Sequence, residues 1–113
     1  MTLGKDIEFE ISARDVKASL DNGQRVTLVD VREPWEYATA RIENSKHIPM
    51  NDIPARAGTE LAPNDHIVVI CHHGVRSARV TAWLREHGFE RAQSMRGGID
   101  LWSRTIDPQV PLY

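Results

Sequence analysis

Four consecutive apolar residues, Ile67-Val68-Val69-Ile70, constrain the fold of this chain more than any other stretch. Such a run of mostly β-branched side chains is typical of a strand buried on both faces, as in a sheet covered by helices. The spacing of a helix face begins after Gly74 and includes Val80, Trp83, Leu84 and His87. This pattern predicts a strand, a tight loop and a helix in succession, with the single cysteine, Cys71, at the end of the strand.

Strands and helices alternate in the prediction for the rest of the chain. Short strands are predicted at 9–11, 26–31, 46–48 and 92–95, and helices after Ser12, from Pro34, over 50–57 and at 99–102. Such alternation predicts an open, largely parallel α/β sheet with helices on both faces. We expect residues 1–113 to form one domain, with Trp35 and Tyr37 as packing residues. The tail with Pro108 and Pro111 is expected to extend along the surface, and the sequence leaves open whether it packs on the same chain.

Composition and charge exclude several classes of function. The net charge of -2 argues against nucleic acid as the main partner. No run approaches the ~18 apolar residues of a membrane span, and Met1–Glu10 has no apolar signal core, so we expect a cytoplasmic protein. One cysteine excludes an internal disulfide and any CxxC redox or zinc motif.

The loop that follows the buried strand, Cys71-His72-His73-Gly74-Val75-Arg76-Ser77, has the features of an anion site. The free N–H groups and the macrodipole at the start of a helix both favour negative charge. Arg76 adds a permanent positive charge, and Ser77 adds a hydroxyl donor. We therefore expect Cys71 to be a reactive thiolate and not an inert buried cysteine. With no second thiol in the chain, any group carried by Cys71 must leave to an external acceptor.

Asp30 and Arg32 lie at the end of the strand predicted at 26–31. Ligands bind at the carboxyl ends of strands in open α/β sheets, which is also where Cys71 falls. We expect the two residues to brace the cysteine loop, with Asp30 accepting hydrogen bonds from loop N–H groups or from Arg76. The alternative is that Asp30 caps the next helix and Arg32 is solvated.

A zinc site built from Cys71, His72 and His73 is disfavoured by their positions. Three consecutive side chains diverge, and no spacing signal supplies a fourth ligand. We expect no metal and no cofactor. His72 and His73 are better explained as rim residues that contact substrate when protonated.

Four segments together resemble a single-domain rhodanese, a sulfurtransferase module, over nearly the whole chain. They are Asp30–Glu33 with Trp35–Tyr37, His47–Pro49, Cys71–Ser77, and Gly97–Ile99 with Trp102. The resemblance implies a five-stranded, mainly parallel sheet with the cysteine loop at its carboxyl edge. This chain departs from the family at Ala40-Arg41-Ile42, where Gly-His-Ile is frequent, and at Asn44, where glycine is frequent.

The resemblance also implies a role for each residue of the loop. Cys71 would attack a sulfane-sulfur donor and become a persulfide, which the loop amides hold until a thiophilic acceptor takes the outer sulfur. Arg76 would close the loop and attract an anionic donor such as thiosulfate, while Asp30 and Arg32 match the bracing pair. The residues expected to bind substrate are His72, His73, Gly74, Val75 and Ser77.

Two classes of function remain open. The first is an enzyme that transfers sulfur through a Cys71 persulfide, and the second is a sulfur-relay or docking module for a persulfide-donating or sulfur-accepting protein. Phosphatases of related fold have five residues between cysteine and arginine, whereas four separate Cys71 from Arg76. The shorter loop suits a single terminal sulfur. Arsenate reduction is disfavoured because it commonly relies on an additional resolving thiol.

Overall fold

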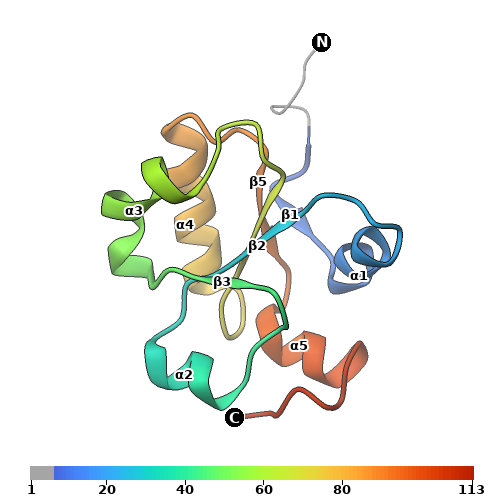
Figure 1. Ribbon diagram of the computed structural model, residues 1–113. Coiled ribbons are helices and arrows are strands. Elements are labelled where there is room, and N and C mark those ends of the chain that lie inside the picture. The colour runs from blue at the N-terminus through green and yellow to red at the C-terminus, as the bar shows by residue number, and fades with distance from the viewer. Residues whose placement is uncertain (1–6) are drawn as a thin grey trace.

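The computed structural model describes residues 7–113, which form a five-stranded parallel sheet between helices (Figure 1). The strands are β1 (Glu10–Ile11), β2 (Thr27–Asp30), β3 (Lys46–His47), β4 (Ile67–Ile70) and β5 (Ala92–Met95). Their order in the sheet is β1-β5-β4-β2-β3, and every neighbouring pair is parallel. The predicted fold class is therefore confirmed. The expectation about Met1–Glu10 concerns a segment that lies mostly outside the described residues.

Five α-helices are present within residues 7–113. They are α1 (Ala13–Asp21), α2 (Pro34–Thr39), α3 (Ile53–Glu60), α4 (Val75–Glu86) and α5 (Gly98–Thr105). Of these, α1 begins after a capping serine, Ser12, and α2 begins with a capping box. The helix predicted over 50–57 is in fact a 3-10 turn at Met50–Asp52 followed by α3. Pro54 lies in the first turn of α3, where a missing N–H breaks no helical hydrogen bond. None of the described helices is long and apolar enough to cross a membrane.

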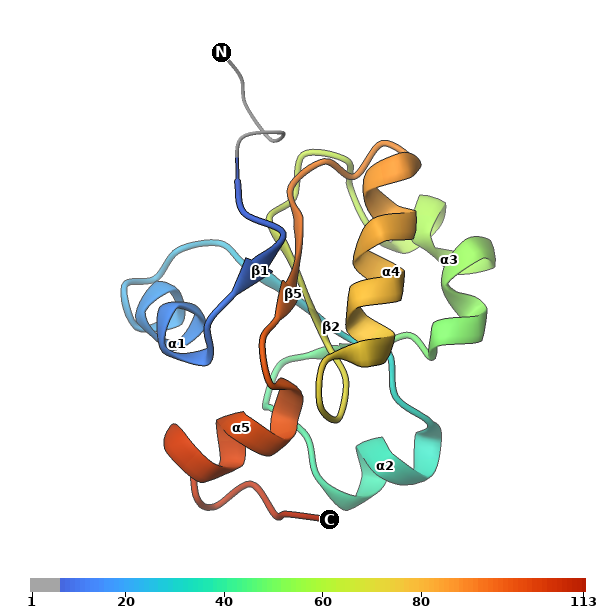
Figure 2. The same ribbon diagram turned by 180° about the vertical axis from the view of Figure 1, so that it is seen from behind.

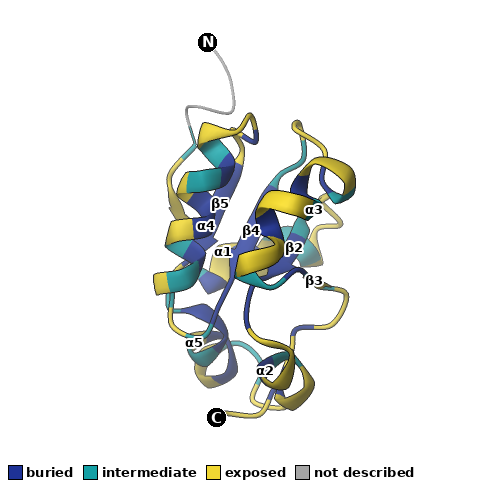
Figure 3. Cartoon of the chain, turned by 90° about the vertical axis from the view of Figure 1, so that its left-hand side faces the viewer, coloured by how far each residue is buried: buried dark blue, intermediate teal, exposed yellow. Residues whose placement is uncertain are grey.

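Helices cover both faces of the sheet, with α1 and α5 on one face and α3 and α4 on the other (Figures 1 and 2). Along β4, Ile67 and Val69 belong to the core cluster beneath α3 and α4, as does Cys71 directly after the strand, whereas Val68 and Ile70 belong to the opposite cluster. All four β4 side chains are fully buried, as predicted. The burial colouring shows the same layering, with buried strands between helices whose outer surfaces are exposed (Figure 3).

The tail after α5 packs on its own chain, a point that the sequence leaves open, because Val110 is buried and the Tyr113 hydroxyl donates to Glu36 Oε2 at 2.7 Å. The expectation about Trp35 is wrong. Trp35 is 63% exposed, so it is not a packing residue of the core. Tyr37 does pack as expected, because its ring stacks on that of His47.

The first turn of α5 holds the cysteine loop by its backbone. The N–H of Ile99 donates to the carbonyl oxygen of Cys71 at 2.9 Å, and that of Asp100 donates to His72 O at 3.1 Å. This approach requires glycine at position 98, because a Cβ there would overlap both carbonyl oxygens and because φ is +61°. The Gly97-Gly98 pair therefore positions the loop.

We expect the substitution Gly98→Ala to lower the free energy of unfolding by about 2 kcal/mol or more, because it combines a backbone clash with an unfavourable φ. The matched control is Gly58→Ala in α3, where a new Cβ meets no atom within 4 Å. That change should stabilise the protein by roughly 0.5–1 kcal/mol, because glycine is a poor helix former. Urea unfolding measures both values, and equal stability of Gly98→Ala and wild type would contradict the clash.

Candidate active site

Cys71 lies directly after β4, with its sulfur enclosed by the following loop. Its side chain is 1% exposed. The N–H of Gly74 points at Sγ, with a distance of 3.0 Å between the two atoms. Gly74 adopts φ +119°, which turns the chain from the strand into α4. The predicted strand, loop and helix around the cysteine are thus present.

Ser77 supplies a second polar contact to the sulfur. Its Oγ lies 3.4 Å from Cys71 Sγ and donates to the carbonyl oxygen of Gly74 at 3.2 Å. The same oxygen lies 2.7 Å from the hydroxyl oxygen of Ser94 on β5. Ser94 was not among the residues expected at the site, because a lone serine in a predicted strand carries no recognisable signal.

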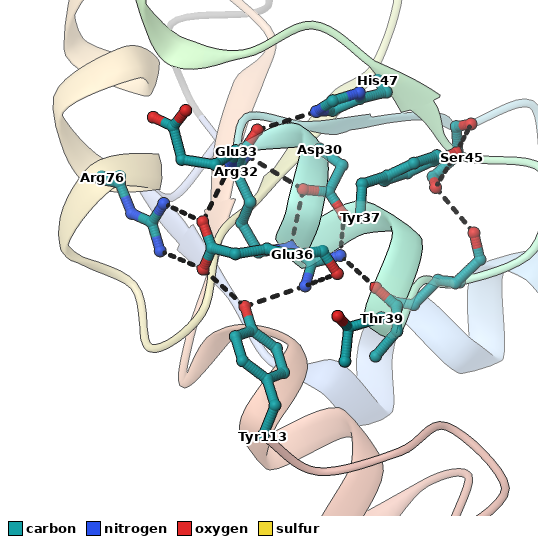
Figure 4. Close-up of polar contacts among 12 residues, drawn as sticks. Asp30, Arg32, Glu33, Glu36, Tyr37, Thr39, Ser45, His47, Arg76 and Tyr113 are labelled. Atoms are coloured by element: carbon teal, nitrogen blue, oxygen red, sulfur yellow. Dashed lines mark hydrogen bonds and ion pairs between the residues drawn. The ribbon is translucent and has the colours of Figure 1, made fainter.

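Arg76 pairs with a carboxylate instead of closing over the sulfur. Its Nη1 and Nη2 donate to Glu36 Oε1 and Oε2 at 2.6 and 2.9 Å (Figure 4). Among the described residues, no hydrogen bond joins Arg76 to Cys71, which corrects the expected closure. Hydrogen bonds from Arg76 lower the pKa of Glu36 to about 2, and those to Glu36 raise the pKa of Arg76. The two side chains are therefore an ion pair at neutral pH.

Glu36 is a site residue that the sequence analysis missed. It is buried on α2, and its Oε1 also accepts a hydrogen bond from the backbone N–H of Glu33 at 2.8 Å. Glu33 and Glu36 form a capping box at the start of α2. Their three-residue spacing is visible in the sequence, but it signals only a helix start and not a partner for Arg76.

Asp30 and Arg32 are fully buried and bind one another, not the cysteine loop. Arg32 Nε and Nη2 donate to the two carboxylate oxygens of Asp30 at 2.8 and 2.7 Å. The expectation that Asp30 accepts from the loop or from Arg76 is therefore wrong. The alternative is wrong as well, because Glu33 is the N-cap of α2 and Arg32 is not solvated.

Arg32 braces α2 and the tail instead. It donates to the backbone oxygens of Glu36 on α2 and of Ala40, the C-cap of that helix, and to the hydroxyl oxygen of Tyr113 (Figure 4). Tyr113 in turn donates to Glu36, and burial raises its pKa to about 12, so its hydroxyl stays protonated. The bracing pair thus acts on Arg76 indirectly, through Glu36.

Aromatic rings form the rim of the loop. The His72 ring lies between those of His73 and Tyr113, with both pairs of ring centres 4.0 Å apart. Burial and the neighbouring His73 lower the pKa of His72, so this imidazole is neutral at pH 7 and not the protonated contact that we expect from sequence. Val75 and His73 are exposed, so the two lie at the surface of the loop.

His72, His73 and Asp100 bring one potential metal-ligand atom each to within 4.8 Å of the others, and Cys71 is not in this group. Two histidines that bind one tetrahedral metal point their nitrogens at it, which spreads the rings apart. Here the two rings lie close together, with centres 4.0 Å apart and planes tilted by 31°, and Asp100 already accepts from Arg104 at 3.0 Å. The geometry is not that of a preformed tetrahedral site.

We expect Glu36→Gln to remove part of the pH dependence of stability. The folded-state pKa of Glu36, about 2, lies below its ordinary value of 4.5. Its ionised form therefore stabilises the fold above about pH 4.5, and this contribution is lost as the pH falls towards 2. The loss should be on the order of 2 kcal/mol. Urea unfolding of wild type and Glu36→Gln at pH 7, 4.5 and 3 measures this loss. The difference in free energy of unfolding between the two proteins should decrease as the pH falls.

Glu43→Gln is the matched control, because Glu43 is exposed. Its free energy of unfolding should follow the wild-type pH dependence. A difference between wild type and Glu36→Gln that stays constant from pH 7 to 3 would contradict the ion pair.

Comparison with known proteins places this geometry in a family. The model of the rhodanese-like domain matches residues 12–105. A sulfurtransferase of Allochromatium vinosum is 35% identical over 95 residues, which cover 84% of this chain and 88% of that protein. MoeZ of Mycobacterium tuberculosis, a probable adenylyltransferase/sulfurtransferase, is 34% identical over 104 residues, which cover 91% of this chain. The match covers only 26% of MoeZ, so this chain spans about a quarter of that relative.

A solved structure agrees with these sequence relatives. The rhodanese-like domain protein of Staphylococcus aureus superposes with a TM-score of 0.81 at 31% identity, and the match covers 94% of this chain and 99% of that chain. The sheet order, the cysteine loop at its carboxyl edge and the family match over most of the sequence all agree. The chain belongs to the rhodanese-like domain family.

Proposed function

We propose that this protein is a sulfurtransferase that carries a sulfane sulfur on Cys71 as a persulfide. The observation that carries the proposal is the surroundings of the sulfur, where the N–H of Gly74 and the hydroxyl of Ser77 lie within hydrogen-bond distance of Sγ. Donors of this kind stabilise a thiolate, which is the nucleophilic form of cysteine. The relatives named as sulfurtransferases support the same chemistry.

The reaction has two half-reactions. The Cys71 thiolate first attacks the outer sulfur of thiosulfate, forming a new S–S bond while the S–S bond of thiosulfate breaks and sulfite leaves with the electron pair. A thiophilic acceptor such as cyanide then attacks the outer sulfur of the persulfide and leaves as thiocyanate, which restores the thiolate. Because Cys71 is the only cysteine of the chain, no internal thiol can take the sulfur.

Arg76 supplies the attraction for an anionic donor. Its side chain is 28% exposed, so solvent and small anions can reach it. A guanidinium has five N–H groups, and the pair with Glu36 uses one from each terminal nitrogen. Within the described part of the chain, the remaining N–H groups have no partner and are available to an anion, while Glu36 fixes the orientation of the side chain.

We expect wild-type protein to gain one sulfur atom, about 32 Da, when it is incubated with thiosulfate, and to lose it on addition of cyanide. Cys71→Ala should gain no mass and should keep the wild-type fold, because alanine fills most of the volume of a buried cysteine. Intact-protein mass spectrometry measures the gain, and circular dichroism checks the fold. A folded Cys71→Ala protein with normal turnover would refute the persulfide.

A second function, sulfur relay to or from a partner protein, is favoured by exposed apolar residues at the site. Trp35 and Val75 are 63% and 67% exposed, and the Trp35 ring lies edge-on to that of Tyr113 with 5.8 Å between ring centres. Exposed aromatic residues of this kind anchor protein partners. A persulfide-bearing protein would then be the physiological donor.

Donor choice distinguishes the two functions. If the protein is a relay, Trp35→Ala should slow sulfur transfer from a persulfidated protein donor by roughly fivefold or more, because it removes an anchor of the docking surface. Transfer from thiosulfate should not change. Phe9→Ala is the control, because Phe9 is also exposed but lies before β1, at the amino ends of the parallel strands. Cys71 follows β4, at their carboxyl ends. Efficient turnover with thiosulfate and equal protein-donor rates in all three proteins would count against the relay.

A further inference from the structure

A line of three buried side chains runs from the sheet to the thiol. Ser94 lies on β5 and pairs in register with Val69 of β4. Its Oγ lies 2.7 Å from Ser77 Oγ, which lies 3.4 Å from Cys71 Sγ. Both serines are 0% exposed, so water does not compete for their hydroxyl groups. The line joins β5, α4 and the end of β4.

The hydroxyl protons of Ser77 and Ser94 have few hydrogen-bond acceptors within reach. Within residues 7–113, the only hydrogen-bond partner of the Ser94 hydroxyl is Ser77 Oγ, whereas Ser77 also contacts the carbonyl oxygen of Gly74. A buried hydroxyl proton without an acceptor costs free energy. Ser94 therefore donates to Ser77, which leaves the single proton of Ser77 for either Gly74 O or the sulfur.

The protonation state of Cys71 decides between these two acceptors. A neutral thiol can donate its own proton to Ser77 Oγ, but a thiolate only accepts. On ionisation, the Ser77 proton turns from Gly74 O to Sγ, while Ser94 continues to donate to Ser77 Oγ. Each hydrogen bond in such a chain polarises the next, so the distant hydroxyl strengthens the contact to the anion.

We propose that Ser94 is a positioning residue, whose hydroxyl orients that of Ser77 towards the Cys71 sulfur anion. This inference rests on the proposed function only in taking the thiolate as the reactive species. Ser94 does not touch the sulfur itself, and its effect passes entirely through Ser77.

Other charged groups near the sulfur stay the same when Ser94 is changed. Arg76 of α4 interacts electrostatically with Cys71 and is paired with Glu36 of α2. His72 of the loop has a lowered pKa because of burial, and His73 and Asp100 act on it in opposite directions. None of these groups contacts Ser94, so a difference between variants at position 94 reports the hydroxyl line.

The test is the rate at which iodoacetamide alkylates Cys71 as a function of pH, measured by intact mass. Ser94→Ala should alkylate roughly three- to tenfold more slowly than wild type at pH 7, with the midpoint of the pH profile shifted upwards. Ser103→Ala is the matched control, because Ser103 is also buried and its hydroxyl has no partner among the described residues. Its pH profile should equal that of wild type.

A double variant tests whether Ser94 acts on Cys71 through Ser77. In a Ser77→Ala background, the further change Ser94→Ala should not move the midpoint, because the connecting hydroxyl is gone. A purely structural role for Ser94 predicts lower stability in thermal unfolding with an unchanged midpoint. That result, or an equal shift in Ser103→Ala, would overturn the inference.

A measurement on wild type keeps the inference testable if Ser94→Ala does not fold. The ¹³Cβ resonance of Ser94 should titrate with the alkylation midpoint of Cys71 and should not titrate in Cys71→Ala. A resonance that is insensitive to pH in wild type would overturn the proposal. Alkylation needs no sulfur donor, so protein that shows the Ser94 effect but never gains sulfur contradicts the proposed function alone.

Discussion

The buried ion pair of Asp30 and Arg32 is the interaction on which the geometry of the site depends. A buried charge is tolerated only when its partners are complete. Arg32 meets this condition with the Asp30 carboxylate, one backbone oxygen of α2 and one of its C-cap residue, and the Tyr113 hydroxyl. These bonds fix α2 and the tail against the end of β2. Glu36 is thereby held where it binds Arg76, so a pair that never contacts the cysteine decides where the loop arginine lies.

The sheet and α5 position the sulfur from the other sides. Parallel pairing sets Asp30 of β2 opposite Ile70 of β4, so both strands end at one edge, next to Cys71. The first N–H groups of α5 then bind the carbonyl oxygens of Cys71 and His72. Satisfying those oxygens from behind leaves the N–H of Gly74 free to face the sulfur. These carbonyl oxygens, which would repel an anion, are thus paired with N–H groups of α5.

Local signals in the sequence were sufficient for the fold and for the cysteine loop. The apolar run of β4 and the glycine at position 74 each depend on neighbouring residues only. Contacts between distant segments were not predictable in this way. Tyr113 reaches Glu36 across 77 positions, and nothing in the pattern of the tail indicates it. The prediction for Asp30 and Arg32 was wrong for the opposite reason, because their bond joins residues two positions apart, whereas the predicted partners lay in the distant cysteine loop.

The exposure of Trp35 could not be predicted from sequence either. The helix α2 has only six residues, Pro34–Thr39, which is too short for apolar spacing to define a buried face. Its buried side chain is the charged Glu36, and its tryptophan is exposed. Hydrophobicity alone therefore predicted the wrong environment for Trp35 and gave no sign that Glu36 is buried.

The attachment of the cysteine loop to α5 has a consequence for how such a domain can diversify. Backbone atoms make the bonds that set the shape of the loop, and glycine at position 98 makes room for them. The exposed side chains of His73 and Val75 take no part in these bonds. Shape and surface chemistry of the loop are thus separate properties of the chain. Evolution or design can exchange the residues that meet a ligand while the sulfur keeps the same surroundings.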